Sequence, residues 1–428
     1  MTTAPLPEVS SAHPVAGVSG RSNELFSGST DPKTSGSGLV SVALFGSAGS
    51  IGTQTLDVVR ANTDRFRIEV IGTRSNTELL LQQVIEFRPR VVAIADNARV
   101  EDIRDRLPAG TELVAGPAAF EEVSGLADVA VNGVVGFAGL GVTIGALAAG
   151  KRLALANKES LITAGPVVAP YRATPGAEII PVDSEHAAVH MCLAADRASS
   201  VSGLHSRVKR LVLTASGGPF RTRDRATLAQ VTVAEALAHP TWAMGPKITV
   251  DSSTLMNKGF EVIEAHELFS IAYDNIDVVV HPQSVVHSMV EYTDGATIAQ
   301  LSMPDMCLPI AYALAWPDRA TTPFGAIDWT TLARLDFESP DREAFRCLDL
   351  AYAAGRAGRT APAWLNAANE VAVEAFLAGS LPWGCIAQVN ETVLGQCDGF
   401  IPTSVGDIIE ADRLARVAAR SAVSHVRI

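Results

Sequence analysis

Short apolar runs alternate with stretches of helical spacing through the first part of the chain. Runs rich in β-branched residues predict strands at Val40–Phe45, Arg67–Gly72, Val91–Ala95, Val129–Val131, Leu153–Ala156 and Ile179–Val182. Helical spacing occupies Ile51–Arg60 and Thr77–Phe87. Because alternating strands and helices are typical of a parallel doubly wound sheet, residues 39–182 are predicted to form a Rossmann-type nucleotide-binding domain.

The pattern changes twice in the rest of the chain. Residues 183–315 are predicted to form a second α/β domain, with strands at Arg210–Thr214, Asp277–His281, Ser288–Tyr292 and Ala296–Leu301. Prolines mark a linker at 316–343. Residues 344–428 are predicted to form a C-terminal helical bundle, with helices at Trp364–Ala378 and Asp407–Ala422. The fold class is therefore α/β, and the bundle is expected to brace the second α/β domain through Asn366, Asn369 and Glu370.

Composition narrows the class of protein. The net charge of −12 argues against a nucleic-acid binder, whose contact surface is basic. Residues 129–150 are uncharged, but glycines interrupt them, which favours a buried strand, a turn and a packed helix over a membrane span. Five cysteines without a C-x-x-C spacing indicate reduced thiols in a cytoplasmic protein. Residues 1–38, rich in Ser, Pro, Gly and Thr, are predicted to be a disordered tail.

Two carboxylates follow the last predicted strand of the first domain. Asp183 and Glu185 stand two residues apart, and side chains on a strand repeat with a period of two. Both would then point to the same side of the strand end and repel each other, unless a hard divalent cation held by oxygen ligands neutralises them. The alternative is a solvated loop that contains two acids.

A glycine-rich turn, GSAGSIG at 46–52, lies between the first predicted strand and helix. Glycine lets the backbone approach a pyrophosphate, whose charge the helix N-terminus stabilises. Where NAD-specific folds place an acid, about 20 residues further on, the chain has Arg74, Ser75 and Asn76. An arginine with hydroxyl and amide groups can bind a 2′-phosphate, so NADP is favoured over NAD. The alternative is a surface turn.

Two other predicted strands end in groups that can bind anions. The turn Ser216-Gly217-Gly218 can present a hydroxyl and backbone amides to an anion, the alternative being an ordinary turn. Lys158 follows the strand at Leu153–Ala156, and ligands of doubly wound sheets bind outside the carboxyl ends of strands. Lys158 is therefore expected near the cofactor crevice, the alternative being a structural lysine paired with Glu159.

A helix with many polar residues is predicted near residue 255. Residues 250–254 have the composition of a helix cap, and a phosphate would bind well in the first turns. Those turns would hold Ser252, Asn257 and Lys258. Glu261 and Glu264 lie three apart and share one face. The alternative is a cap followed by solvated charges, but burying such charges among apolar neighbours is costly without a role.

Eight motifs together resemble the 1-deoxy-D-xylulose 5-phosphate reductoisomerase family. They are GSAGSIG (46–52), ALANKES (154–160), PVDSEH (181–186), ASGGPF (215–220), HPTWAMG (239–245), VDSSTLMNKGFEVIEA (250–265), HPQSVVHSMVE (281–291) and LNAANEVAVEAFL (365–377). The resemblance runs from Val40 to beyond Leu377 and so covers nearly all of the chain outside the predicted tail.

The resemblance implies an enzyme that rearranges 1-deoxy-D-xylulose 5-phosphate to a branched aldehyde. The enzyme would reduce this aldehyde with NADPH to 2-C-methyl-D-erythritol 4-phosphate, the committed step of non-mevalonate isoprenoid synthesis. The resemblance also implies a divalent cation, Mg²⁺ or Mn²⁺. It makes residues 183–315 the catalytic domain that binds metal and substrate and through which a homodimer would form. The sequence leaves open whether the carbon skeleton rearranges by a retro-aldol/aldol path or by a concerted α-ketol shift.

The resemblance further implies roles for individual residues. The metal ligands would be Asp183, Glu185 and Glu261, with Glu264 in or beside that shell. The catalytic residues would be Lys158, Asp183, Glu185, Glu261 and His239. The substrate would contact Ser184, Glu185, Ser216, Ser252, Asn257, Lys258, Glu261 and a flap that carries His239, Trp242 and Met244. NADPH would contact Gly46, Ser47, Ala48, Gly49, Ser50, Ile51, Arg74, Ser75, Asn76, Asn157, Lys158, Glu159 and Gly245.

The chain departs from the family pattern at a few positions. Ala48 stands where many members have Thr, the 74–76 turn replaces a common Gly-Lys-Asn form, and Pro246 stands where a basic residue is frequent. Two other functions stay open. One is a metal-dependent NADP enzyme that acts on a different phosphorylated sugar or hydroxy acid. The other is a catalytically silent NADP sensor, which predicts the loss of at least one of Asp183, Glu185, Glu261 and Lys158.

Overall fold

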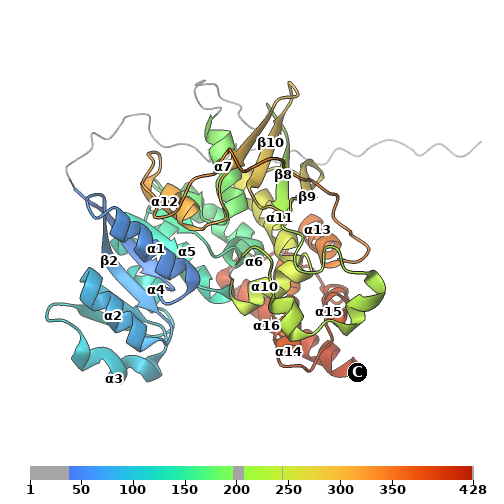
Figure 1. Cartoon of the computed structure of the whole chain (residues 1–428). Coiled ribbons are helices and arrows are strands. Elements are labelled where there is room, and N and C mark those ends of the chain that lie inside the picture. Colours follow the sequence, from blue (N-terminus) through green and yellow to red (C-terminus); the bar gives the residue numbers. More distant parts are fainter. Residues whose placement is uncertain (1–37, 196–206, 243, 427–428) are drawn as a thin grey trace, which may run out of the picture.

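Seven parallel strands form the sheet of the N-terminal domain. The structure is a computed structural model that describes residues 38–195, 207–242 and 244–426 (Figure 1), so the predicted tail lies, except for Gly38, outside the described residues. The strand order is β4-β3-β2-β1-β5-β6-β7. The bounds are β1 (Val40–Phe45), β2 (Phe66–Thr73), β3 (Val91–Ile94), β4 (Glu112–Ala115), β5 (Val129–Asn132), β6 (Arg152–Leu155) and β7 (Glu178–Pro181). The order reverses between β1 and β5, where a doubly wound sheet opens a crevice. The predicted fold class is confirmed.

Helices cover both faces of this sheet. Along β1, Val42 and Leu44 belong to one apolar cluster, whereas Ala43 and Phe45 belong to the other, as the period of two requires. The first cluster includes side chains of α1 (Ser50–Ala61), α2 (Thr77–Phe87) and α12 (Cys307–Ala315). The second includes side chains of α4 (Ala119–Val123), α5 (Leu140–Ala148) and α6 (Glu159–Val168). The chain thus returns, at α12, from the predicted 183–315 domain to the first sheet.

A second sheet has the order β11-β10-β8-β9. Its strands are β8 (Val208–Ala215), β9 (Ile276–Val280), β10 (Val286–Tyr292) and β11 (Thr297–Leu301). β8 and β9 are parallel, whereas β10 is antiparallel to both β8 and β11. α7 (Ser184–Ala195) packs against β10 and β11, and α11 (Met256–Phe269) packs against β8 and β9. All four strands were predicted to within a few residues.

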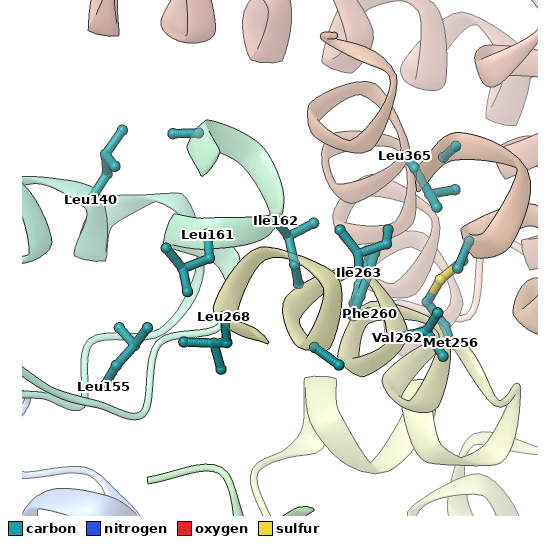
Figure 2. Packing of buried hydrophobic residues seen from close by; sticks show 14 of the residues in the cluster. Leu140, Leu155, Leu161, Ile162, Met256, Phe260, Val262, Ile263, Leu268 and Leu365 are labelled. Carbon is teal, nitrogen blue, oxygen red and sulfur yellow. The ribbon is translucent and has the colours of Figure 1, made fainter. Parts of the chain in front are cut away.

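The C-terminal helices are α13 (Cys347–Ala357), α14 (Ala361–Leu377), α15 (Cys385–Leu394) and α16 (Val405–His425). α14 contacts the other three, and it also contacts α6 and α10 (Pro246–Ser253). One apolar cluster joins Leu155 and Leu161 of the first domain, Phe260 and Ile263 of α11, and Leu365 of α14 (Figure 2). The predicted domains therefore share one continuous core at their meeting point.

One strand of the first sheet was missed by the prediction, and the uncharged segment was assigned correctly. β4 was not predicted, because it is a four-residue edge strand with two exposed ends and lacks a buried apolar run. The uncharged segment at 129–150 forms β5, a turn and α5, as predicted. Among the described residues, no helix combines the length and the apolar content that a membrane crossing requires.

Candidate active site

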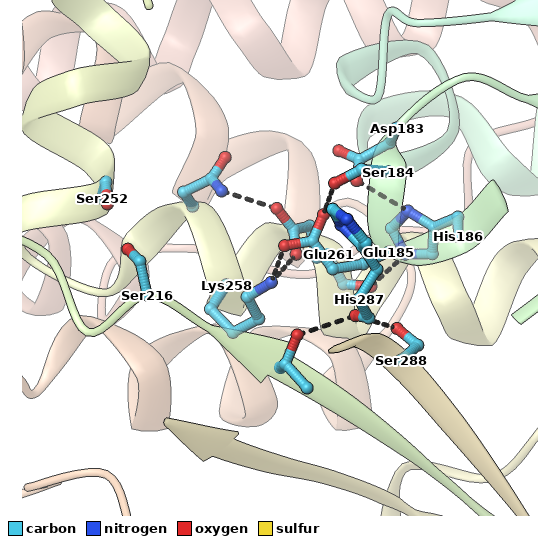
Figure 3. Close-up of polar contacts among 12 residues, drawn as sticks. Asp183, Ser184, Glu185, His186, Ser216, Ser252, Lys258, Glu261, His287 and Ser288 are labelled. Atoms are coloured by element: carbon cyan, nitrogen blue, oxygen red, sulfur yellow. Dashed lines mark hydrogen bonds and ion pairs between the residues drawn. The ribbon is translucent and has the colours of Figure 1, made fainter. Parts of the chain in front are cut away.

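Three acidic side chains from two segments of the chain meet at the carboxyl end of β7. Oxygen atoms of Asp183, Glu185 and Glu261 all lie within 4.8 Å of one another. Figure 3 shows these side chains pointing toward one another, with Glu261 approaching from α11. The prediction that Asp183 and Glu185 alternate along a strand is wrong. β7 ends at Pro181 and α7 begins at Ser184, so the two acids converge through the first turn of a helix.

Two lysines neutralise most of this negative charge. Lys158 Nζ forms an ion pair with Asp183 and lies 3.1 Å from Glu261 Oε1. Lys258 Nζ lies 2.6 Å from Glu185 Oε1 and also forms an ion pair with Glu261. Three carboxylates and two ammonium groups leave a formal charge of −1, which attracts a cation.

Burial and charge shift these groups in opposite directions. Burial disfavours the Lys158 ammonium, but the charges of Asp183 and Glu261 outweigh it and raise the pKa of Lys158 well above its ordinary value. Burial likewise opposes ionisation of Asp183, but the charge of Lys158 holds its pKa well below the usual range. Burial and the neighbouring charge of Glu261 raise the pKa of Glu185 to about 7.

A fully buried histidine, His186, contacts two of the three acid-bearing residues and a fourth acid. His186 Nε2 is 2.9 Å from the carbonyl oxygen of Glu261, and Nδ1 is 3.1 Å from Glu264 Oε2 and 3.5 Å from Asp183 Oδ1. Burial opposes a charge on His186, but the charge of Glu264 outweighs it and raises the histidine pKa well above its ordinary value. Glu264 therefore lies beside the three acids and reaches them through His186.

The donor set fits a hard divalent cation. All three side chains offer oxygen, which Mg²⁺ and Mn²⁺ prefer over nitrogen or sulfur. Asp183 Oδ1 is buried and has no hydrogen-bond partner within the described part of the chain. Its one charged neighbour there, His186 Nδ1, is 3.5 Å away, which is too long for a good hydrogen bond, so a directly bound cation would satisfy this buried oxygen more fully.

Two serines and a histidine form a second polar group across the cleft. His239 Nε2 lies 3.0 Å from Ser216 Oγ and 3.2 Å from Ser252 Oγ. His239 Nδ1 accepts hydrogen bonds from the backbone amides of Thr241 and Trp242 at 3.2 and 3.0 Å. Nδ1 is therefore the unprotonated nitrogen, and Nε2 carries the proton that faces the serines. Burial lowers the pKa of His239, which favours this neutral form.

The position of Ser252 differs from the prediction. Ser252 lies near the end of α10, and α11 begins only at Met256, so Ser252 does not cap the helix that carries Glu261. Leu255, with φ of +60°, makes the break between the two helices. Gly218 allows the turn at residues 216–218 to approach α10, because a Cβ there would lie 2.7 Å from the Ser252 carbonyl oxygen.

A cleft of about 440 Å³ connects these groups. It is lined by every residue predicted to contact substrate, namely Ser184, Glu185, Ser216, His239, Trp242, Met244, Ser252, Asn257, Lys258 and Glu261. Sequence reasoning missed Ser284, His287 and the segment 304–306, which also line it. His287 belongs to the HPQSVVHSMVE motif, so the resemblance included this histidine. Its sequence neighbours gave no sign that it lines the cleft. Burial lowers the pKa of His287 to about 4.

The glycine-rich turn lies where β1 and β5 meet. A Cβ on Gly46 would lie 2.4 Å from the Gly133 carbonyl oxygen, and one on Gly52 would lie 2.3 Å from the Gly46 carbonyl oxygen. Only glycine allows such close backbone contacts. Of the residues predicted to bind NADPH, Ser50, Ile51, Lys158 and Gly245 line the cleft. Arg74, Ser75 and Asn76 are exposed just beyond the end of the neighbouring strand β2.

Two predicted NADPH contacts use their side chains inside the protein. Asn157 donates to the carbonyl oxygens of Val134 and Gly136 at 2.6 and 2.8 Å and accepts from the Ser160 amide at 3.0 Å. Glu159 lies 3.3 Å from Lys247 Nζ. Both residues are buried, so their contact with a cofactor stays a prediction.

Comparisons with known proteins agree over nearly the whole chain. The 1-deoxy-D-xylulose 5-phosphate reductoisomerase family profile matches residues 42–165, and profiles for its C-terminal domains match residues 179–269 and 301–418. A 1-deoxy-D-xylulose 5-phosphate reductoisomerase of Xanthomonas campestris is 50% identical over 91% of this chain and 98% of its own length. One of Thermosynechococcus vestitus is 49% identical over 87% of this chain and 90% of its own.

Solved structures show the same similarity. The Zymomonas mobilis reductoisomerase in complex with NADPH has a TM-score of 0.84 and 39% identity, covering 91% of this chain and all of its own. A DOX-P reductoisomerase in complex with NADPH, fosmidomycin and magnesium has a TM-score of 0.83 and 38% identity, covering 90% of this chain and 98% of its own. This chain belongs to the 1-deoxy-D-xylulose 5-phosphate reductoisomerase family.

Proposed function

We propose that the chain converts 1-deoxy-D-xylulose 5-phosphate to 2-C-methyl-D-erythritol 4-phosphate, with NADPH as reductant and Mg²⁺ or Mn²⁺ as cation. The observation that carries this proposal is the meeting of Asp183, Glu185 and Glu261 with two lysines in one cleft. The glycine-rich turn opens onto the same cleft through Ser50 and Ile51. Relatives crystallised with NADPH and with magnesium support both cofactors.

The cation would be held by Asp183, Glu185 and Glu261. When bound, it would supply Lewis-acid polarisation of the substrate carbonyl and hydroxyl oxygens. Lys158 holds a proton at Nζ beside two of these acids, so it can donate a hydrogen bond to a substrate oxygen that gains negative charge. Lys258 neutralises Glu185 and Glu261 in this structure, and its ammonium group would be available to a substrate oxygen if a cation took over that role.

The substrate phosphate would bind to the second polar group. Three donors would serve it, because the Nε2–H of His239 lies 3.0 Å from Ser216 Oγ and 3.2 Å from Ser252 Oγ. Binding energy gained at the phosphate is far from the reacting carbons and can be used for orientation. Trp242 and Met244 line the cleft beside this group and would exclude water from the reactive aldehyde.

NADPH would bind along the turn that begins at Gly46. The amides at the start of α1 would bind the pyrophosphate, and α1 has no acidic residue in its first turn to repel it. Arg74, Ser75 and Asn76 would hold the 2′-phosphate from the end of β2. Asn157 would position the cofactor site indirectly, since it holds the loop at residues 134–136 and also donates to Glu159.

The chain would form a homodimer in the cytoplasm. A groove of about 560 Å³ lies between α7, the edge strand β11 and residues 319–329. Trp329 in this groove is 68% exposed and Met303 is 41% exposed, and a second copy would cover both. Light scattering after gel filtration should give twice the chain mass, and Trp329→Glu should shift it toward the monomer. The five unpaired cysteines fit a reducing compartment.

Oxidation of NADPH in the presence of the substrate and Mg²⁺ or Mn²⁺ tests the reaction. Loss of NADPH absorbance and formation of 2-C-methyl-D-erythritol 4-phosphate are expected. A folded, metal-loaded protein that oxidises no NADPH with this substrate, but does so with another phosphorylated sugar or hydroxy acid, would have the first alternative function. The silent-sensor alternative is disfavoured, because all three acids and Lys158 are present and meet.

A further inference from the structure

A lysine behind the cleft joins three parts of the chain. Lys247 is the second residue of α10 and follows the cleft-lining Gly245 by two positions. Its Nζ lies 3.0 Å from Asp251 Oδ2, one turn along the same helix, and 3.3 Å from Glu159 Oε1 at the start of α6. The ammonium group also faces the Phe260 ring at 5.2 Å from its centroid.

Hydrogen bonds extend this ion pair in both directions. Asp251 Oδ1 accepts from Asn369 Nδ2 at 2.6 Å, and Asn369 Oδ1 accepts from Asn390 Nδ2 at 3.1 Å. These contacts reach α14 and α15 of the C-terminal bundle, as predicted for Asn369. On the other side, Glu159 Oε2 accepts from Asn157 Nδ2 at 3.3 Å. A continuous polar chain thus links the bundle, α10 and the loop before α6.

The carboxylates of this chain need the lysine charge. Their side chains are 2% exposed for Asp251 and 8% for Glu159, and removing one partner of a buried ion pair leaves a costly unpaired charge. Lys247 is therefore held between two elements rather than on the surface of one. The ammonium group of Lys247 and the two carboxylates hold the first turn of α10 against the N-terminus of α6.

Both ends of this contact bear directly on the cleft. Lys158 precedes Glu159 and reaches Asp183 and Glu261. On the α10 side, Gly245 and Ile248 line the same cleft. We propose that Lys247 is a positioning residue, whose ammonium group sets the distance between the α10 wall of the cleft and the loop that carries Lys158. This inference rests on the proposed function for its kinetic test.

The variant Lys247→Met removes the charge and keeps most of the length of the side chain. Because a misplacement of about 1 Å can cost about 100-fold in rate, kcat should fall between about 10- and 100-fold. The Kd for Mn²⁺ should stay within about twofold of wild type, since Lys247 does not touch the three acids. Lys209→Met is the matched control. Lys209 also pairs with a glutamate, Glu291, at 2.6 Å, but it is exposed and away from the cleft, so its variant should keep wild-type kcat.

A double variant separates positioning from simple stabilisation. Lys247→Met combined with Asp251→Asn removes one buried charge of each sign, so part of the lost Tm should return. The low kcat should not return, because the link to Glu159 is still absent. Recovery of kcat together with Tm would show a merely structural role and overturn the proposal, as would a wild-type kcat in Lys247→Met.

Hydrogen exchange of the substrate-free protein gives a readout that does not depend on turnover. Lys247→Met should speed exchange of the amides in the first turn of α10 and at residues 156–160, and leave β8 unchanged. Unchanged exchange at both places would refute the coupling. If wild-type protein fails to oxidise NADPH, the proposed function fails, and this exchange measurement still decides whether Lys247 holds the two elements together.

Discussion

Replacing Glu185 by glutamine tests the metal site most directly. The substitution keeps the shape of the side chain and one carbonyl oxygen but removes its negative charge. Glu185 Oε1 lies 2.6 Å from Lys258 Nζ, and Oε2 accepts a hydrogen bond from Ser184 Oγ at 2.6 Å. The variant therefore changes the formal charge of the three acids and two lysines from −1 to 0 without emptying the space.

The expected loss of metal affinity follows from this charge change. Two unit charges about 4 Å apart interact by about 4 kcal/mol at an effective dielectric of 20, and a divalent cation doubles that value. Desolvation of the ion and carboxylate cancels much of it. A net loss of about 3 kcal/mol corresponds to a Kd for Mn²⁺ that is about 100-fold weaker. Turnover should be abolished at metal concentrations that saturate the wild type.

Electron paramagnetic resonance measures free Mn²⁺ in such a titration, and NADPH fluorescence measures cofactor binding. Glu185→Gln should bind NADPH as wild type does, because Glu185 is outside the glycine-rich turn. Glu291→Gln, which removes the charge from two ion pairs of β10, is the control and should change neither affinity. Wild-type Mn²⁺ affinity in Glu185→Gln, or a parallel loss of NADPH binding, would refute the assignment of this carboxylate to the metal.

Three further predictions follow from pKa, turn geometry and packing. Because burial and Glu261 raise the pKa of Glu185 to about 7, protons compete with the cation below that pH, and Mn²⁺ affinity should fall about tenfold from pH 7.5 to 6. Gly52→Ala places a Cβ 2.3 Å from the Gly46 carbonyl oxygen, so NADPH should bind at least about tenfold more weakly by fluorescence titration. Trp383→Leu loses a 2.9 Å hydrogen bond to Ser253 and an aromatic contact, and should lower the free energy of unfolding in urea by about 2–4 kcal/mol.

Each has an outcome that contradicts it. A flat Mn²⁺ affinity across that pH range would show that Glu185 is already ionised when the cation binds. Gly384→Ala, where a Cβ meets nothing within 4 Å, should leave NADPH binding unchanged; equal weakening in both alanine variants would remove the steric explanation. A Trp383→Leu protein as stable as wild type would show that the contacts of this ring with Ser253 and Phe220 do not stabilise the fold.

Local pattern was enough for the architecture of the chain. The runs at 42–45 and 91–94 are continuously apolar because central parallel strands are buried on both faces, and this pattern is visible without any partner. In 66–73, Arg67 and Glu69 alternate with buried apolar residues before the buried end at 70–73. The glycine spacing at 46–52 reports a backbone constraint that is local as well. By contrast, β4 has neither a buried run nor an alternation, and only its neighbour β3 makes it a strand.

The sequence by itself determined which residue types were available: three acids, two lysines and two serines in motifs far apart along the chain. Tertiary structure decided how they meet, because contacts between distant segments depend on packing and not on spacing. It put Glu185 on a helix instead of a strand, Ser252 at the end of α10, and His287 in the wall of the cleft. It also brought Lys247, which pairs locally with Asp251, to Glu159, a contact over 88 residues that no local pattern encodes.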